Sequence, residues 1–92
     1  MSIAHERIDR LYALAASAAA DGDDDRAREY VGLARRIAER NRLRFPREFE
    51  RSTCDRCDRY HRPGRNARVR LRDGRVVVTC DCGSQQRYPY RN

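Results

Sequence analysis

The sequence predicts a small α+β protein: two antiparallel helices, a linker, and a ribbon of about three antiparallel strands held together by cysteines. Apolar residues recur at helical spacing in the first half, side chains alternate around Asp73-Gly74, and four cysteines form two close pairs. With 92 residues, 39% hydrophobic and 38% charged, the chain cannot bury a large core and is expected to need a metal, disulfides or a partner. The predicted parts are a helical hairpin in residues 1–45, a linker in 46–53 and the ribbon in 54–92.

The first helix is expected from Ser2 to Ala20, with the Ser2 hydroxyl as its N-cap. One face of this segment carries apolar side chains at helical spacing: Ile8, Leu11, Tyr12 and Ala15. Two short alanine-rich helices cannot cover each other's apolar faces fully. We therefore expect these four residues to contact a partner protein.

The second helix is expected to begin in the acidic loop Asp21–Asp25, where a glycine interrupts the first helical pattern. Asp23 is the expected N-cap, and the carboxylates that follow it favour the positive end of the helix dipole. The apolar stripe continues to about Leu43, and Pro46 disfavours helical backbone at the residue before it. The two helices together predict an antiparallel hairpin.

Basic charge is concentrated in the last two thirds of the chain. Residues 1–29 contain seven acidic residues and four arginines, a net charge of −3, whereas the remainder contains seventeen arginines and seven acidic residues, a net charge of +10. This density predicts a polyanionic partner, nucleic acid rather than a membrane, because no segment carries bulky apolar groups opposite its arginines. Five arginines near the end of the second helix are expected to contact this partner: Arg35, Arg36, Arg40, Arg42 and Arg44.

The cysteine spacing predicts one zinc ion per chain. Cys54 and Cys57 are separated by two residues, which lets two thiolates bind a tetrahedral zinc from a tight turn. Cys80 and Cys82 are separated by one residue, so either their loop is tighter or His61 supplies a ligand instead. In a reducing cytosol two close pairs favour zinc over disulfides, with a redox pair or free thiols as the remaining alternative.

The segment between the cysteine pairs predicts a β-hairpin with Asp73-Gly74 as its turn. This turn sets the register: Arg72 opposite Arg75, Leu71 opposite Val76, Arg70 opposite Val77, Val69 opposite Val78, and Arg68 opposite Thr79. Since alternate pairs share a face, four apolar side chains are expected on a buried side: Val69, Leu71, Val76 and Val78. The opposite face is expected to bind an anion through Arg68, Arg70, Arg72 and Arg75.

The chain begins Met1-Ser2-Ile3, without a basic and apolar leader, and has no apolar run of bilayer length. We therefore expect a cytoplasmic protein with no membrane partner.

Five stretches resemble a known family: "ERIDRLYALA", "REYVGLARRIAERNRLRFPRE", "CDRC", "PGRNARVRLRDGRVVVTC" and "RYPY". The family is that of archaeal ribonuclease P protein component 4, related to the eukaryotic Rpr2 and Rpp21-type subunits. The resemblance covers nearly the whole chain. Its most specific part is Pro63–Cys80 followed by Arg87-Tyr88-Pro89-Tyr90.

The resemblance implies a noncatalytic subunit of a ribonucleoprotein whose RNA, with magnesium, removes the 5′ leader from precursor tRNA. It implies that the helices bind ribonuclease P protein component 1 and that the subunit binds the specificity domain of the ribonuclease P RNA, in its complex with precursor tRNA. The implied zinc ligands are Cys54, Cys57, Cys80 and Cys82, although the family has two residues between the last two cysteines. The expected RNA-binding residues are the arginines named above together with Arg65 and Arg87.

Two other classes of function fit the sequence. A zinc ribbon can serve as an RNA- or DNA-binding subunit of another ribonucleoprotein or transcription assembly, and a C-x2-C pair can serve a thiol enzyme. The enzyme is disfavoured because the pair precedes a turn-rich, strand-rich segment, and because four cysteines close the coordination shell of zinc.

Overall fold

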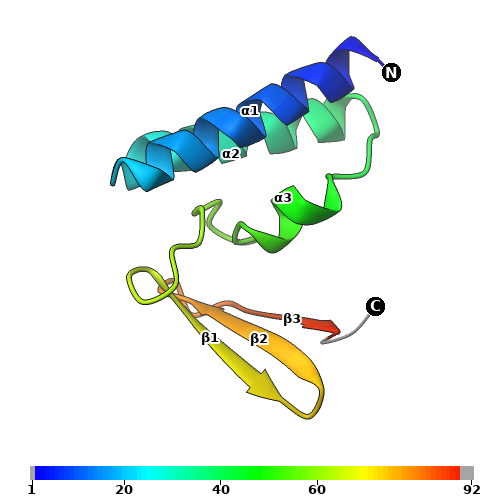
Figure 1. The fold of residues 1–92 in the computed structure, drawn as a ribbon. Coiled ribbons are helices and arrows are strands. Elements are labelled where there is room, and N and C mark those ends of the chain that lie inside the picture. The colour runs from blue at the N-terminus through cyan, green and yellow to red at the C-terminus, as the bar shows by residue number, and fades with distance from the viewer. Residues whose placement is uncertain (1, 90–92) are drawn as a thin grey trace. The chain divides into compact units, whose positions relative to one another are not determined.

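The computed structural model describes residues 2–89 (Figure 1). These residues divide into two compact units, one ending at Tyr60 and the other beginning at His61. Tyr90, the last residue of the quoted "RYPY", lies outside the described residues. The first unit contains the helices α1 (Ile3–Ala20), α2 (Asp24–Arg40) and α3 (Arg47–Arg51). The second contains an antiparallel sheet of three strands in sequence order, β1 (Ala67–Arg72), β2 (Arg75–Cys80) and β3 (Gln85–Pro89). The predicted fold class is confirmed.

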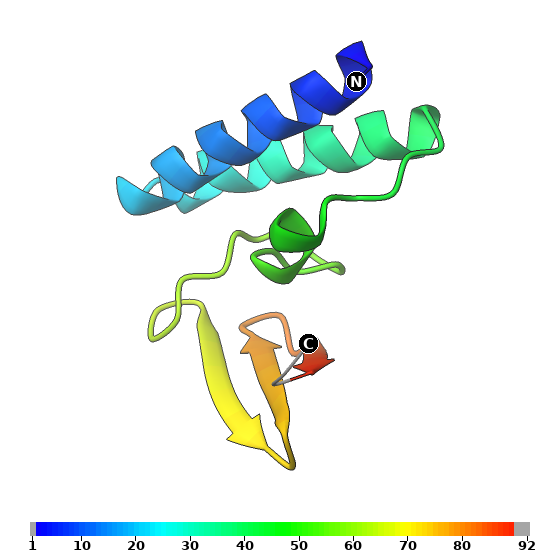
Figure 2. The ribbon, with the colours of Figure 1, turned by 45° about the vertical axis from the view of Figure 1, so that its right-hand side comes forward.

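Both long helices have the predicted N-caps. Ser2 accepts a hydrogen bond from the His5 amide at 3.2 Å, and Asp23 accepts one from the Arg26 amide at 3.1 Å. These acceptors satisfy amides that have no partner inside the first helical turn. α1 and α2 lie side by side and run in opposite directions (Figures 1 and 2). No helix within residues 2–89 has the length and apolar character that a membrane span requires.

α2 ends at Arg40, before the predicted end at Leu43. Arg42 has a left-handed φ of +53°, and the Leu43 amide turns back to the Ala38 carbonyl at 2.8 Å. This Schellman arrangement satisfies a terminal carbonyl and packs Leu43 against the hydrophobic core. The apolar stripe therefore continues into the turn after α2, and the pattern predicted a helix that is longer than the observed one.

α3 is a five-residue helix that the sequence pattern did not reveal, within the segment expected to be a linker. Its Phe49 is 0% exposed, and the Phe49 ring stacks on Tyr12 and Phe45 at centroid distances of 4.6 and 4.4 Å. A helix this short is not stable alone, so the burial of Phe49 holds it in place. Phe49 shares one core with six residues of α1 and α2: Ile8, Leu11, Ala15, Val31, Ala34 and Ala38.

The predicted hairpin register is confirmed at all of its pairs, and one further pair joins Ala67 to Cys80. Asp73 and Gly74 have φ values of +52° and +74°. Two positive φ values are the signature of a type I′ turn, whose twist matches that of the paired strands. β3 pairs with the other edge of β2, so β2 is the central strand.

The burial of the two sheet faces differs from the prediction. Val69 and Leu71 are 46% and 65% exposed, and Val76 is half-buried, whereas Val78 is 7% exposed. Val77, on the arginine face, is 9% exposed. The expectation that Val69 and Leu71 are buried is therefore wrong. They lie on the edge strand β1, whereas Val77 and Val78 lie on the central strand, which has a neighbour on each side.

The two valines of one cross-strand pair are expected to differ in their contribution to stability. Val78→Ala should lower the free energy of unfolding by about 1.5–3 kcal/mol, because it removes buried methyl groups and leaves a cavity. Val69→Ala should change it by less, about 1 kcal/mol at most, because Val69 is 46% exposed and buries less apolar surface. Urea denaturation of both variants checks this difference, and equal losses would contradict the observed burial.

Candidate metal centre and arginine groove

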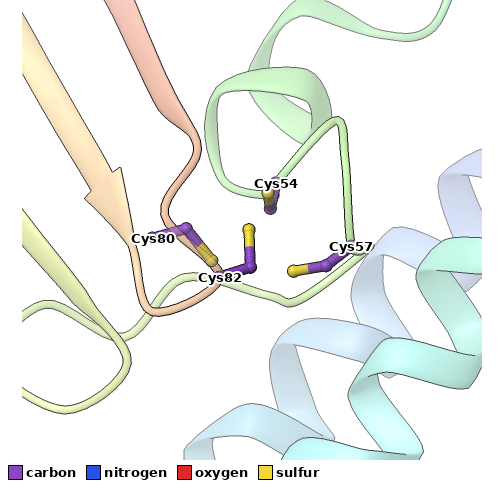
Figure 3. Close-up of side chains that lie close together, drawn as sticks. All are labelled: Cys54, Cys57, Cys80 and Cys82. Atoms are coloured by element: carbon purple, nitrogen blue, oxygen red, sulfur yellow. The ribbon is translucent and has the colours of Figure 1, made fainter.

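The cysteines of the two predicted pairs converge. The Sγ atoms of Cys54, Cys57, Cys80 and Cys82 all lie within 4.8 Å of one another, and Figure 3 shows the four side chains gathered together. Cys54 and Cys80 are buried, and the other two are half-buried. Within residues 2–89, these four side chains are the group of potential ligands close enough together to hold a metal ion.

The first pair is presented by the turn from Cys54 to Asp58. The Asp58 amide donates to the Cys54 carbonyl at 3.0 Å, and the Cys54 amide donates to the Arg59 carbonyl at 2.8 Å. On either side of the turn, Thr53 and Tyr60 form an isolated antiparallel bridge. These bonds close the backbone around the two cysteines.

The second pair is presented by a tighter turn at the end of β2. The Cys80 amide donates to the Ser84 carbonyl and the Gly83 amide donates to the Cys80 carbonyl, both at 2.9 Å. Gly83 has a φ of +96°, which glycine adopts without steric cost. The one-residue spacing is thus accommodated, since both Cys80 and Cys82 belong to the group and His61 does not.

Four thiols at this separation suit a zinc ion. Sulfurs bound at about 2.3 Å from a tetrahedral zinc lie about 3.8 Å apart, so only small side-chain movements separate the observed cluster from that geometry. Soft thiolate ligands select zinc over magnesium or calcium. Four protein ligands also fill the coordination shell, which is the arrangement of a structural site.

One face of the sheet is lined by arginines. Val77 of β2 pairs with Arg70 of β1 on one side and with Arg87 of β3 on the other. Two residues further along the same face, Arg72 of β1 pairs with Arg75 of β2. Like charges directly opposite each other destabilise a sheet, and an anion lying across them would offset that repulsion. A groove of about 620 Å³ lies over this face, with Asp73 as an acidic member of a lining that includes Arg68, Arg70, Arg72, Arg75 and Arg87.

The arginines near the end of α2 fall into two environments. Four of them are exposed: Arg36, Arg40, Arg42 and Arg44. Arg65, in the turn before β1, is exposed as well. The Arg35 side chain is only 19% exposed, and its Nε donates to Asp58 Oδ1 at 2.7 Å. The Arg35 guanidinium is thus engaged inside the first unit, and the expected contact of Arg35 with RNA stays a prediction.

The four residues expected to contact a partner lie in or against the core of the first unit. Ile8, Leu11 and Ala15 are at most 8% exposed, and Tyr12 is half-buried against Phe49. As expected, α2 does not cover this face alone, and Phe49 of α3 supplies the rest of the cover inside the unit. Docking on protein component 1 stays a prediction, but Leu11→Asp cannot test it, since a buried carboxylate would unfold the unit.

The residues that hold the first cysteine turn were missed by sequence reasoning. Arg28 Nε donates to the Cys57 carbonyl at 2.7 Å, and Arg35 contacts Asp58. Two signals pointed to such contacts. Gly32 lies inside α2, where glycine is disfavoured unless another segment approaches closely, and Asp58 directly follows Cys57.

Tyr60 is the last residue of the first unit, and the centre of its ring lies 6.4 Å from the centre of the Tyr12 ring. Burial raises the pKa of the Tyr60 hydroxyl above the ordinary value of tyrosine, and the neighbouring Tyr12 raises it further, against a hydrogen bond with Ser52 that lowers it. The hydroxyl therefore stays protonated at neutral pH, so it adds no negative charge to the first unit.

The fold and the site define a class: a small protein with a helical hairpin, a four-cysteine ribbon and an arginine-lined sheet face. Residues 7–83 match the family model described as "RNAse P Rpr2/Rpp21/SNM1 subunit domain". The chain therefore belongs to the Rpr2/Rpp21/SNM1 family of ribonuclease P subunit domains, and the resemblance read from the sequence is confirmed.

Individual relatives agree with this family. A Halobacterium salinarum protein named "Ribonuclease P protein component 4" is 71% identical over 89 residues, which cover 97% of this chain and 96% of the relative. A protein of the same name from Methanocaldococcus jannaschii is 50% identical, over 95% of this chain and 71% of the relative.

Two solved structures share the fold. A chain of the "cryo-EM structure of archaeal Ribonuclease P with mature tRNA" has a TM-score of 0.87 and 48% identity, over 95% of this chain and 76% of that one. The structure described as "Pfu Rpp21" has a TM-score of 0.64 and 38% identity, over 95% and 99% of the two chains.

Proposed function

We propose that this chain is a zinc-containing, RNA-binding subunit of ribonuclease P that assists the catalytic RNA in removing 5′ leaders from precursor tRNA. Family membership supports the assignment to ribonuclease P rather than to another ribonucleoprotein or a transcription assembly. The similarity to a chain from an archaeal ribonuclease P with mature tRNA supports the RNA-bound context. In this proposal the bond cleavage belongs to the RNA, and the chain acts in the cytoplasm as a noncatalytic subunit.

The arginine groove carries the proposal of RNA binding. Five guanidinium groups line one groove on the sheet, and each can form two parallel hydrogen bonds to a phosphate. An RNA backbone presents phosphates in series, so it neutralises several of these cations at once. The exposed arginines at the end of α2 and Arg65 provide further phosphate contacts in the same proposal.

The four cysteines are proposed to bind zinc as a structural ion. Cys80 ends β2, the central strand that carries Val77 and Val78. Fixing that end of the strand with metal bonds would keep the arginine face in one shape. In this proposal the ion cross-links distant parts of the chain through the four cysteine side chains and takes no part in RNA cleavage.

A protein partner completes the proposal. We propose that the helical hairpin associates with ribonuclease P protein component 1, as the family resemblance implies. Since the core residues of α1 are internal, the contact must use exposed positions of the helices rather than Ile8, Leu11 or Ala15.

RNA binding at the groove is tested by the salt dependence of affinity. The chain is assembled with ribonuclease P RNA and the remaining protein subunits, and its affinity is measured at several salt concentrations. Arg70→Ala and Arg87→Ala are each expected to lower the log–log slope by about 0.7–0.9 for every phosphate that the variant no longer neutralises. Arg10→Ala, which removes the same charge from an exposed position of α1, is the matched control and should leave the slope unchanged.

The nature of the contact is tested by Arg70→Lys, which keeps the charge but loses the planar fork. Weaker binding than wild type would indicate bidentate contacts. Equal slopes for wild type, both groove variants and the control would contradict RNA binding at the groove. In that event Arg40→Ala and Arg44→Ala would show whether the end of α2 is the RNA surface.

A further inference from the structure

Arg35 of α2 reaches both ends of the first cysteine turn. Its Nε donates to Asp58 Oδ1 at 2.7 Å, and its Nη2 donates to Thr53 Oγ1 at 3.0 Å and to the Cys54 carbonyl at 3.1 Å. Thr53 precedes the first cysteine of the pair, and Asp58 follows the second. One guanidinium therefore spans the turn that presents Cys54 and Cys57.

The surroundings of Arg35 hold its guanidinium in one position. The Arg35 side chain is 19% exposed and its guanidinium carbon lies 4.7 Å from the centre of the Phe45 ring, while Thr53 and Cys54 are both 0% exposed. Thr53 also donates to the Phe49 carbonyl at 2.9 Å, which ties it to α3. The guanidinium uses two separate nitrogens for these bonds, whereas all three donors of a lysine ammonium sit on one atom and do not reproduce this planar fork.

The turn approaches α2 closely because Gly32 leaves room for it. A methyl group at Gly32 would lie 3.3 Å from Asp58 Oδ2, so a side chain there would push the carboxylate away. Asp58 itself has a φ of +65°, a conformation that Asp adopts more readily than most residues. Arg28, one turn before Gly32 on α2, adds the bond to the Cys57 carbonyl.

We infer that Arg35 is a positioning residue for the metal centre, which holds Cys54 and Cys57 in their ligand arrangement through the backbone of the turn and through Asp58. The helical hairpin thus prepares half of the ligand set before the ion arrives. Residues that orient metal ligands in this way usually change metal affinity by about 10–100-fold when they are altered. This inference rests on the proposed zinc site.

A reciprocal effect follows from thermodynamic linkage. If the hairpin favours metal binding, metal binding must favour the hairpin by the same free energy. Zinc is therefore expected to raise the midpoint of α1–α2 unfolding in the wild-type chain, and to raise it less in a chain without Arg35.

The inference is tested by the zinc affinity of the full-length chain, measured by competition with a chromophoric chelator. Arg35→Lys is expected to bind zinc about 10–100-fold more weakly than wild type. Asp58→Asn, which keeps the shape of the partner and removes its charge, is the second variant and should show a loss in the same direction. Arg10→Lys, the same substitution at an exposed position of α1, is the matched control and should bind as wild type does.

Helicity of the zinc-free chains separates positioning from a general loss of structure. Positioning predicts that Arg35→Lys or Asp58→Asn keeps wild-type helicity by circular dichroism while its zinc affinity falls. Affinity within about twofold of wild type in both variants, or a fall that only accompanies lost helicity, overturns the inference. A wild-type chain that binds no zinc would instead refute the proposed metal site itself.

Discussion

Replacing Cys54 by serine is expected to remove zinc from the chain and to unfold the ribbon, the largest effect expected of any single substitution in this chain. Cys54 is 0% exposed, and its sulfur belongs to the four-cysteine cluster. A serine hydroxyl stays protonated near neutral pH and is a poor substitute for a thiolate. Structural zinc contributes about 10–16 kcal/mol of apparent binding free energy in small domains, so the loss of one ligand outweighs the stability of the ribbon.

The measurement combines zinc content with thermal unfolding. Wild type should carry one zinc per chain and lose ribbon structure when a chelator is added, whereas Cys54→Ser should already lack the ion and show no further response to the chelator. The helical circular dichroism of Cys54→Ser should largely remain at low temperature, because the first unit has its own core, which includes Ile8 and Phe49. Full zinc content and an unchanged unfolding temperature in the variant would contradict a structural metal centre.

Replacing Phe49 by alanine is expected to lower the free energy of unfolding of the first unit by about 3–5 kcal/mol. Phe49 is fully buried between the rings of Tyr12 and Phe45. No side chain caps the N-terminus of α3, and at its C-terminal end the Ser52 hydroxyl donates to the Glu48 carbonyl at 2.8 Å. A single-turn helix needs more than that bond, so we expect the packing of Phe49 to contribute most of its stability. Small domains have only about 5–15 kcal/mol of total stability, so this single cavity removes a large part of it.

Urea denaturation followed by circular dichroism measures this loss, with zinc content kept equal in all samples. Leu33→Ala is the matched control: Leu33 lies on α2 but is 42% exposed, and its loss should cost about 1 kcal/mol, well below the loss expected for Phe49→Ala. Equal destabilisation by the two substitutions would show that α3 does not complete the core.

The features that the sequence predicted correctly depend on residues only a few positions apart. Ser2 and Asp23 cap helices because their side chains reach amides three positions ahead, and the tertiary structure has little influence on that geometry. Asp73-Gly74 likewise fixes a type I′ turn, and the turn alone sets every pair of the hairpin. The two-residue spacing that brings the thiols of Cys54 and Cys57 close together is local in the same sense.

Burial was decided only by the tertiary structure. The alternation of β1 and β2 identified the two faces correctly, but it carried no information on which strand lies at the edge, so Val69 was wrongly expected inside. The apolar face of α1 appeared to need a partner because the sequence pattern did not predict α3. Its five residues are too few to show the hydrophobic periodicity of a helix. Phe49 covers that face from a segment distant in the chain.

The sequence by itself determined the type and order of the elements, the helix caps, the hairpin register, the paired cysteines and the family. The tertiary structure decided which arginines are available. Arg35 and Arg36 are neighbours with the same charge, yet one lies between Phe45 and Asp58 and the other faces solvent. The physical reason is that propensity, capping and turn geometry depend on neighbours in the chain, whereas exposure and ion pairing depend on segments that the fold brings together from a distance.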